Sequence, residues 1–228
     1  IRVTSINYLK YINIFILALI LTGISYLIYK TYDKMFAVIL YFGFLFSPWI
    51  TAFSGNLFWV EFLWFLPCLM SLLLFNYKKY LYIFLPLIFV SVLIKSLCGY
   101  EYLSSILLLM VSFWVVELII NRSNQRKKVF VMLCAISLVS LAGFIVALII
   151  HSSIRGDSVI AGLKSIWQND VLRRTIGGSA QNFDQGCRDS ILASPLSVIE
   201  KYFTWQTPIV YGIDAKLFPI LFLFSLVI

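Results

Sequence analysis

The chain has 228 residues, of which 61% are hydrophobic and 12% are charged, and its mean hydropathy is +0.96. A water-soluble domain is about half apolar and about a quarter charged, so this composition excludes a soluble globular protein and makes lipid the solvent for much of the surface. The net charge of +8 does not indicate nucleic-acid binding, because no basic run is interleaved with stacking aromatic residues. In membrane proteins, basic residues collect in cytoplasmic loops and beside anionic headgroups.

Apolar runs of the length of a membrane span follow one another through the first 150 residues. A helix needs about 20 mainly apolar residues to cross the hydrocarbon layer. Six runs qualify, and they are residues 11–29, 35–53, 57–75, 80–94, 103–120 and 129–150. Pro48, Pro67 and Pro86 fall inside these runs, where we expect kinks rather than helix ends. The sequence therefore predicts an all-α polytopic membrane protein, with residues 1–150 as a six-span bundle.

The short connections between these runs alternate in charge. The first, third and fifth connections hold eight basic residues, namely Lys30, Lys34, Lys78, Lys79, Arg122, Arg126, Lys127 and Lys128. The intervening short connections hold Lys95 alone. The positive-inside rule then predicts that the basic turns face the cytoplasm and that the N-terminal end lies outside.

Residues 151–216 form a long polar segment, which this orientation places on the non-cytoplasmic side. Connections of this length are usually functional or disordered. Ser194 and Pro195 have the chemistry of a helix start, and the following residues up to Trp205 suit a helix lying on the outer membrane surface. A further transmembrane helix is predicted to begin near Leu217 and to occupy 217–228, which brings the total to about seven.

Several polar residues are predicted to lie near the outer interface. Ionisable groups at membrane depth are costly, so each is a candidate functional group. Glu61, Lys95 and Glu101 come at roughly the same depth, together with Asn56. A carboxylate there can take a proton from a hydroxyl, and Lys95 can hold an anionic phosphate. The alternatives are that Lys95 and Glu101 pair with each other, or that Lys95 extends to the headgroups.

Other polar residues have a weaker case. Arg173, Arg174 and Arg188 are candidates for phosphate binding in the long segment, with solvated loop charges as the alternative. His151 and Glu117 are expected at the membrane interfaces.

Cofactor motifs and metal sites are not evident in the sequence. It contains no P-loop, no dinucleotide-binding glycine motif and no cluster of metal ligands, so the sequence indicates no particular cofactor and leaves a divalent metal open. Cys98 and Cys187 are both predicted on the outer side, where a disulfide is possible but not indicated by spacing.

Short aromatic-rich segments carry a family resemblance. They read SPW at 47–49, FSGNLFWVEF at 53–62, LP at 66–67 and CGYEY at 98–102. Over about the first 120 residues, the chain resembles the multispanning glucosyltransferases that modify bacterial O-antigen and convert serotype, a branch similar to the GT-C class.

The resemblance implies a function and a location. Such enzymes transfer a sugar from a polyprenyl phosphate, here undecaprenyl phosphate, to an O-antigen polysaccharide of lipopolysaccharide, on the periplasmic face of the bacterial inner membrane. For this function we assign residues by their predicted position on the outer side: Glu61 and Glu101 as catalytic, Lys95, Arg173, Arg174 and Arg188 as binding the donor phosphate, and Asn56, Trp59 and Tyr100 as binding substrate.

The sequence departs from this family at its beginning. GT-C enzymes usually carry their catalytic acid in the first outer loop, whereas the first connection here, residues 31–34, is short and predicted to be cytoplasmic. The chain also opens without Met and stops within an apolar run. The resemblance therefore implies that a first span and a catalytic loop precede Ile1.

Two other functions are compatible with the sequence. An O-antigen polymerase or ligase also combines many spans with a large arginine-containing outer loop. A flippase or transporter of lipid-linked sugars is less favoured, because charged residues near the midplane and matched halves are not evident.

Overall fold

The computed structural model describes residues 3–120, 126–172, 184–210 and 213–216, together with Pro219 and Leu223. Tertiary contacts divide the chain into two units, Ile1–Leu148 and Ile149–Ile228. The long helix α7, Arg126–Arg155, runs from the first unit into the second.

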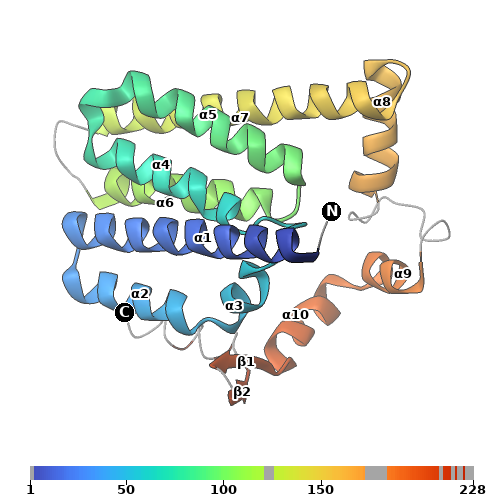
Figure 1. The fold of residues 1–228 in the computed structure, drawn as a ribbon, viewed down its shortest axis with the longest axis horizontal. Coiled ribbons are helices and arrows are strands. Elements are labelled where there is room, and N and C mark those ends of the chain that lie inside the picture. Colours follow the sequence, from blue (N-terminus) through green and yellow to red (C-terminus); the bar gives the residue numbers. More distant parts are fainter. Residues whose placement is uncertain are drawn as a thin grey trace. The chain divides into compact units, whose positions relative to one another are not determined.

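The first unit is an up-and-down arrangement of helices joined by short turns (Figure 1). Helix α1 packs against α2 and α4, and α4 packs against α5 and α6. The elements are α1 Val3–Thr31, α2 Lys34–Phe46, α3 Pro48–Ser54, α4 Phe62–Asn76, the 3-10 turn η1 Lys78–Tyr80, α5 Leu81–Cys98, α6 Leu103–Ile120 and the first part of α7.

This is a helical membrane protein, and four helical segments within the described residues are long and apolar enough to span a bilayer. They are Tyr8–Thr31, Lys78–Cys98, Leu103–Ile120 and Arg126–Arg155. Helices α2 and α4 have 13 and 15 residues, so at about 1.5 Å per residue they are shorter than the roughly 30 Å hydrocarbon core. The predicted span near Leu217 falls almost wholly outside the described residues.

The second predicted span is interrupted at Ser47. This residue is extended, with φ −67° and ψ 114°, and its Oγ accepts a hydrogen bond from the backbone N–H of Ile50 at 3.4 Å. A residue before proline disfavours helical geometry, and serine followed by proline is a good helix start. The prediction of a kink was therefore wrong at Pro48, where one helix ends and another begins. Pro67 and Pro86 do lie inside α4 and α5, as predicted.

The third predicted span also begins later than expected. The turn of residues 55–61 is not helical, and α4 starts at Phe62. Glu61 therefore precedes the helix rather than lying inside it.

Buried hydrogen bonds join α4 and α6 within the bundle. Trp114 is fully buried, and its Nε1 donates to Ser71 Oγ at 3.0 Å, while that hydroxyl donates to the carbonyl oxygen of Met110 at 2.7 Å. Such interhelical bonds supplement van der Waals packing where lipid surrounds the helices. Around them lies an apolar core of Leu74, Phe75, Ile88, Val92, Met110, Val129 and Ile136.

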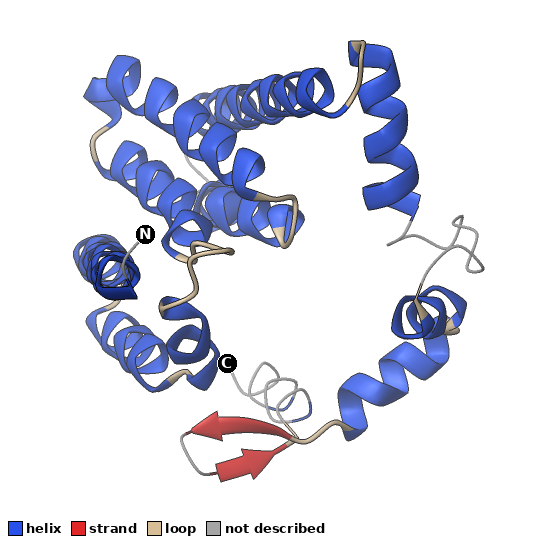
Figure 2. Cartoon of the chain, turned by 45° about the vertical axis from the view of Figure 1, so that its right-hand side comes forward, coloured by secondary structure: helices blue, strands red, loops and turns tan. Residues whose placement is uncertain are grey.

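The second unit contains short helices and a β-hairpin (Figure 2). Its elements are α8 Val159–Ile166, a π-helical turn Trp167–Val171, α9 Gln185–Leu192, α10 Pro195–Thr204, β1 Thr207–Val210 and the antiparallel β2 Ile213–Ala215. The predicted helix after Ser194 is confirmed, and Ser194 Oγ accepts from the backbone N–H of Ser197 at 3.1 Å. The hairpin was not predicted. Arg155 at the end of α7 forms an ion pair with Asp170.

A glycine permits the close approach of α7 to α5. A Cβ added at Gly143 meets the carbonyl oxygen of Phe89 at 2.8 Å and the Cβ of Val92 at 3.5 Å. Both are parts of α5, and a backbone atom cannot be moved aside cheaply.

We therefore expect Gly143→Val to lower the free energy of unfolding by about 1–3 kcal/mol, because overpacking forces the helices apart. The matched control is Ala142→Val, since Ala142 is exposed on the same turn. Thermal unfolding in detergent measures the difference. Equal midpoints for the two variants would contradict the close packing.

Candidate functional site

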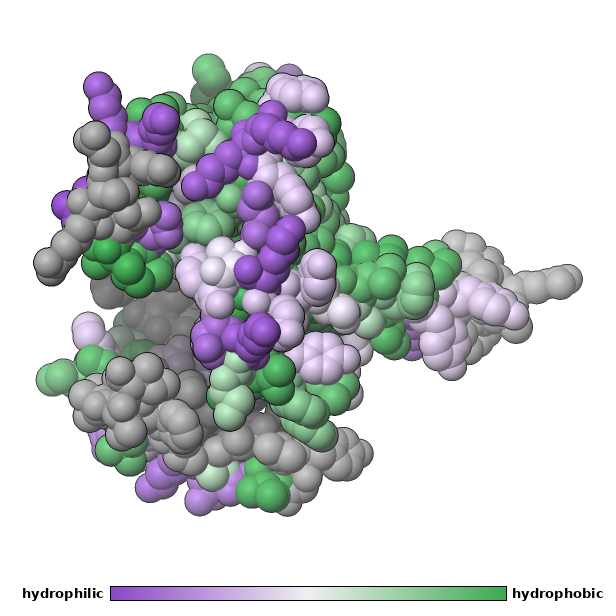
Figure 3. Space-filling view, turned by 90° about the vertical axis from the view of Figure 1, so that its left-hand side faces the viewer, coloured by the Kyte–Doolittle hydropathy of each residue, from purple (hydrophilic) through white to green (hydrophobic). Residues whose placement is uncertain are grey.

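The two ends of the first unit differ in chemistry. We call one the basic end; it carries Lys30, Lys34, Lys78, Lys79, Arg126, Lys127 and Lys128 at the ends of α1, α4 and η1 and at the starts of α2 and α7. Figure 3 faces the side where α1 ends and α2 begins and shows hydrophilic side chains gathered between hydrophobic flanks. The other end carries what we call the polar turns, residues 55–61 and 99–102.

Aromatic side chains connect the two polar turns. The ring of Trp64, in the first turn of α4, lies 4.9 Å from that of Tyr102 and 6.0 Å from that of Phe53. Trp59 packs on Phe53 at 4.8 Å. Because Glu61 lies three residues before Trp64 and Glu101 lies next to Tyr102, this aromatic contact brings together the turns that hold both predicted acids.

Asn13 of α1 holds the first polar turn in place. Its Nδ2 donates to the carbonyl oxygens of Ser54 at 2.9 Å and Asn56 at 3.2 Å. The residue is 4% exposed, and its Oδ1 is buried with no hydrogen-bond partner among the described residues. An amide within an apolar helix thus fixes the turn and leaves one acceptor unused.

Asn56 shapes the same turn through its side chain. Its Oδ1 accepts hydrogen bonds from the backbone N–H groups of Phe58 at 2.8 Å and Trp59 at 3.1 Å. The chain then passes through Val60, whose φ of +44° is unfavourable for a β-branched residue. The structure therefore gives Asn56 a positioning contact, whereas its predicted substrate contact stays a prediction.

Glu61 is buried directly after this strained residue. Its side chain is 2% exposed, and Oε2 finds no hydrogen-bond partner in the described part of the chain. It lies outside the candidate membrane spans. Burial without a compensating cation disfavours the charged form and raises the pKa of this carboxyl to about 8. Such a carboxyl is a strong proton acceptor once it is ionised.

Lys95 does not extend to the surface. It is 2% exposed, and its Nζ donates to the carbonyl oxygen of Gly99 at 2.8 Å, which caps the end of α5. Glu101 is close enough to act on Lys95 electrostatically. Of the predicted alternatives, extension to the headgroups is wrong. The ammonium group has further donors beyond the one used on Gly99.

Gly99 is needed where it stands. Its φ is +144°, and a Cβ there would collide with the carboxylate of Glu101. Beside it, Ser96 is fully buried, and its Oγ has no partner within the described ranges. Tyr102 also has a positive φ, +58°, so a strained residue adjoins each of the two acids.

Of the other predicted residues, Tyr100 belongs to the second polar turn, whereas the three arginines belong to the part of the chain after Leu148. Tyr100 is half-buried and packs edge-on against Phe144 of α7 at 5.9 Å. Arg188 is exposed on α9 in the second unit, and Arg173 and Arg174 lie outside the described residues. Cys98 is an exposed free thiol, and the side chain of Cys187 lies outside the described residues, so their disulfide stays open as the sequence left it. Among the described residues, no group of three His, Cys, Asp or Glu is placed to hold a metal ion.

Sequence reasoning missed Asn13, Ser96, Trp64 and Tyr102. Asn13 had a usable signal, because an amide within a span is costly and needs a partner. Ser96 had none, since serines in apolar helices commonly bond to their own backbone.

No protein-family model, curated protein or solved structure matches the chain.

Loss of the Asn13 donor is expected to loosen the first polar turn. Asn13→Asp keeps the shape but removes both hydrogen bonds to the carbonyl oxygens of Ser54 and Asn56. We expect the amide hydrogens of Phe58 and Trp59 to exchange faster. Each 1 kcal/mol lost from the stability of the turn against local opening raises the exchange rate about fivefold. Unchanged exchange would contradict the positioning role. Asn169→Asp, which alters an exposed asparagine in the second unit, is the control.

The burial of Glu61 makes stability dependent on pH. The folded-state pKa of about 8 exceeds the ordinary value of 4.5, so between these values the folded protein binds a proton that the unfolded chain releases. The free energy of unfolding therefore falls as pH rises through this window.

Glu61→Gln abolishes this titration, so its stability relative to the wild type is expected to rise from pH 5 to pH 9, by an amount on the order of a few kcal/mol. Thermal unfolding at the two pH values measures it. The exposed Glu200→Gln is the control. A pH-independent difference between Glu61→Gln and the wild type would refute the assignment.

Proposed function

We propose that this protein is a membrane glycosyltransferase, which transfers glucose or a similar sugar from a polyprenyl phosphate to a polysaccharide acceptor such as O-antigen. The observation that carries the proposal is Glu61, a buried carboxyl with an unpartnered oxygen that follows the strained Val60. Strained residues and unsatisfied buried groups cluster at functional sites, because folding alone does not favour them.

The reaction is a displacement at the anomeric carbon of the donor sugar. The acceptor hydroxyl oxygen forms the new bond to that carbon, and the bond from the carbon to the phosphate oxygen breaks. The bonding electrons leave with the polyprenyl phosphate. Glu61 in its ionised form takes the hydroxyl proton, so the products are the glycosylated acceptor and the lipid phosphate.

Other polar groups at the same end of the first unit have complementary roles in this proposal. Lys95 steadies the charge that develops on the leaving phosphate through donors not used on Gly99. Glu101, held against Gly99, orients the acceptor or keeps Lys95 in place. Ser96 Oγ and Asn13 Oδ1 are buried polar atoms whose hydrogen bonds a bound sugar can complete.

The proposed sidedness follows from the basic end. If those cations anchor the cytoplasmic leaflet, the polar turns face the periplasm of a bacterial inner membrane. A lipid-linked donor then fits better than a sugar nucleotide, because nucleotides are confined to the cytoplasm.

Helix α10 suits the same side of the membrane. Leu196, Ile199, Tyr202 and Trp205 are exposed apolar or aromatic side chains on or directly after this short helix. A helix of this kind lies in the membrane interface. We propose that it rests on the outer surface and presents the second unit to the polysaccharide.

The polymerase or ligase alternative assigns the function to different residues. It requires Arg173, Arg174 or Arg188, and their loss is then expected to change O-antigen length. Under the glycosyltransferase proposal, loss of Glu61 changes sugar decoration and leaves the length distribution intact. A lipopolysaccharide ladder on a gel separates these outcomes.

The direct test is sugar transfer in vesicles that contain the full chain, a polyprenyl-phosphate glucose with labelled sugar, and an O-antigen acceptor. We expect Glu61→Gln to lower kcat by about 10²–10⁴-fold, the usual contribution of a general base. In the wild type, kcat is expected to rise with pH through about 8, as Glu61 loses its proton.

Two controls make the result interpretable. Glu117→Gln changes a glutamate of α6 near the basic end and is expected to leave transfer unchanged. Thermal unfolding of Glu61→Gln shows whether the variant is folded. Full activity in folded Glu61→Gln would overturn the proposed role of this residue.

A further inference from the structure

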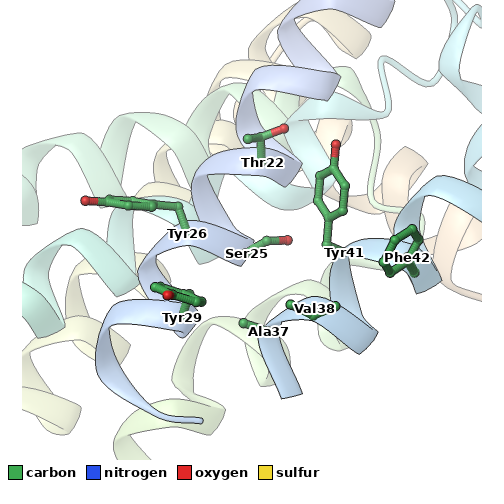
Figure 4. A pocket seen from close by; sticks show the side chains of 8 residues that line it. All are labelled: Thr22, Ser25, Tyr26, Tyr29, Ala37, Val38, Tyr41 and Phe42. Atoms are coloured by element: carbon green, nitrogen blue, oxygen red, sulfur yellow. The ribbon is translucent and has the colours of Figure 1, made fainter. Parts of the chain in front are cut away.

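A groove runs between α1 and α2 on the side of the first unit that faces away from α4. It has a volume of about 390 Å³ and is lined by one stripe of each helix, from Thr22 to Tyr29 on α1 and from Ala37 to Phe42 on α2 (Figure 4). This size is within the usual range of about 300–1,000 Å³ for sites that hold small molecules.

The surface of the groove is suited to a hydrocarbon chain. The hydroxyl of Ser25, which lines it, already donates to the carbonyl oxygen of Leu21 at 3.0 Å, so that polar group needs no ligand. Val38 and Tyr26 are exposed at its rim and contribute apolar carbon.

The ammonium group of Lys34 lies where the groove reaches the basic end of the first unit. Lys34 lies three and four residues before Ala37 and Val38, so it continues the lining stripe of α2 by one turn. Its Nζ is 5.6 Å from the ring centroid of Tyr29, a residue of the groove wall. The ammonium group is thus placed at the mouth of the groove.

Helix stability does not account for this lysine. Lys34 is the first residue of α2, where the helix dipole disfavours a cation. The nearby Asp33 is used as the cap, with Oδ1 accepting from the backbone N–H of Phe36 at 2.9 Å. Within the described residues, Lys34 forms no ion pair with a carboxylate. Its charge is therefore available for an outside anion.

We infer that this groove binds an anionic phospholipid of the leaflet at the basic end, with one acyl chain between α1 and α2 and the headgroup phosphate on Lys34. Lys30, whose Nζ donates to Tyr77 Oη at 3.1 Å, adds a second ammonium group at the same end of α1. The site lies at the opposite end from the polar turns, so it does not depend on the proposed glycosyl transfer.

Native mass spectrometry of the full chain tests this inference. The protein is released from detergent in an equimolar mixture of phosphatidylglycerol and phosphatidylethanolamine, and the retained lipids are counted. We expect the wild type to retain phosphatidylglycerol preferentially. Lys34→Gln is expected to lower that preference about fivefold, the effect of one lysine near an anionic lipid surface. Lys34→Arg is expected to keep it.

The groove itself is tested by a variant that fills it. Val38→Trp is expected to abolish retention of the preferred lipid, whereas Val116→Trp, at an exposed position on α6, is the matched control and is expected to retain it. Lys79→Gln, which removes an exposed lysine that lies on Tyr80, is the control for charge. Circular dichroism establishes that each variant is folded.

Two outcomes would overturn the inference. One is an unchanged ratio of phosphatidylglycerol to phosphatidylethanolamine in folded Lys34→Gln and Val38→Trp. The other is displacement of phosphatidylglycerol by an equal concentration of undecaprenyl phosphate, with the same variants losing the polyprenyl lipid, since the groove would then belong to the sugar donor.

Discussion

The cost of an unsatisfied polar group in hydrocarbon organises this structure. Inside the helices, serine hydroxyls donate hydrogen bonds to backbone carbonyl oxygens of the same helix. Ser25 donates to Leu21, Ser91 to Ile88 and Ser140 to Ile136. Ser71 and Trp114 satisfy each other across two helices. Against this background, the unpartnered atoms of Asn13, Glu61 and Ser96 are exceptions within the described residues. Polar groups that are kept buried at such a cost indicate a ligand.

The charged side chains at the two ends of the bundle differ in their exposure to solvent. At the basic end, Lys30, Lys34, Lys78 and Lys79 lie over aromatic rings at 4.7–5.6 Å and remain exposed. An ammonium group on an aromatic face keeps its charge available to solvent or headgroups. At the other end, Lys95 and Glu61 are withdrawn from solvent. The first arrangement fits contact with anionic lipid headgroups, and the second fits a site that holds one substrate in a defined position.

Much of the fold followed from the sequence, because long apolar runs have few alternatives in lipid. Helix α6 has the predicted bounds, and α10 begins at the predicted serine and proline. The break at Ser47 was missed because a count of apolar residues ignores local backbone preference. The rule that a residue before proline avoids helical geometry predicts it. The start of α4 at Phe62 could not be predicted in this way, since it depends on how Asn13 and Asn56 hold the preceding turn.

The charged residues of the candidate site could be predicted from the sequence, but their contacts could not. The sequence placed Glu61, Lys95 and Glu101 at one depth from the positions of the spans alone. It did not show that Glu61 is buried, because burial depends on residues distant along the chain. It also did not show that the ammonium group of Lys95 donates a hydrogen bond to the carbonyl oxygen of Gly99.

The backbone gives the most specific reason to assign function to the polar turns. Val60 and Tyr102 are the non-glycine residues with positive φ in the described part of the chain, and each adjoins a predicted acid. Conformations of this kind cost about 1–3 kcal/mol each and persist only where surrounding contacts enforce them. Here the enforcing contacts are visible, since Asn56 binds the amides before Val60 and Trp64 packs on Tyr102. A bundle selected only for stability would relax both turns, so their joint strain beside Glu61 and Glu101 favours a role for these acids in binding or chemistry.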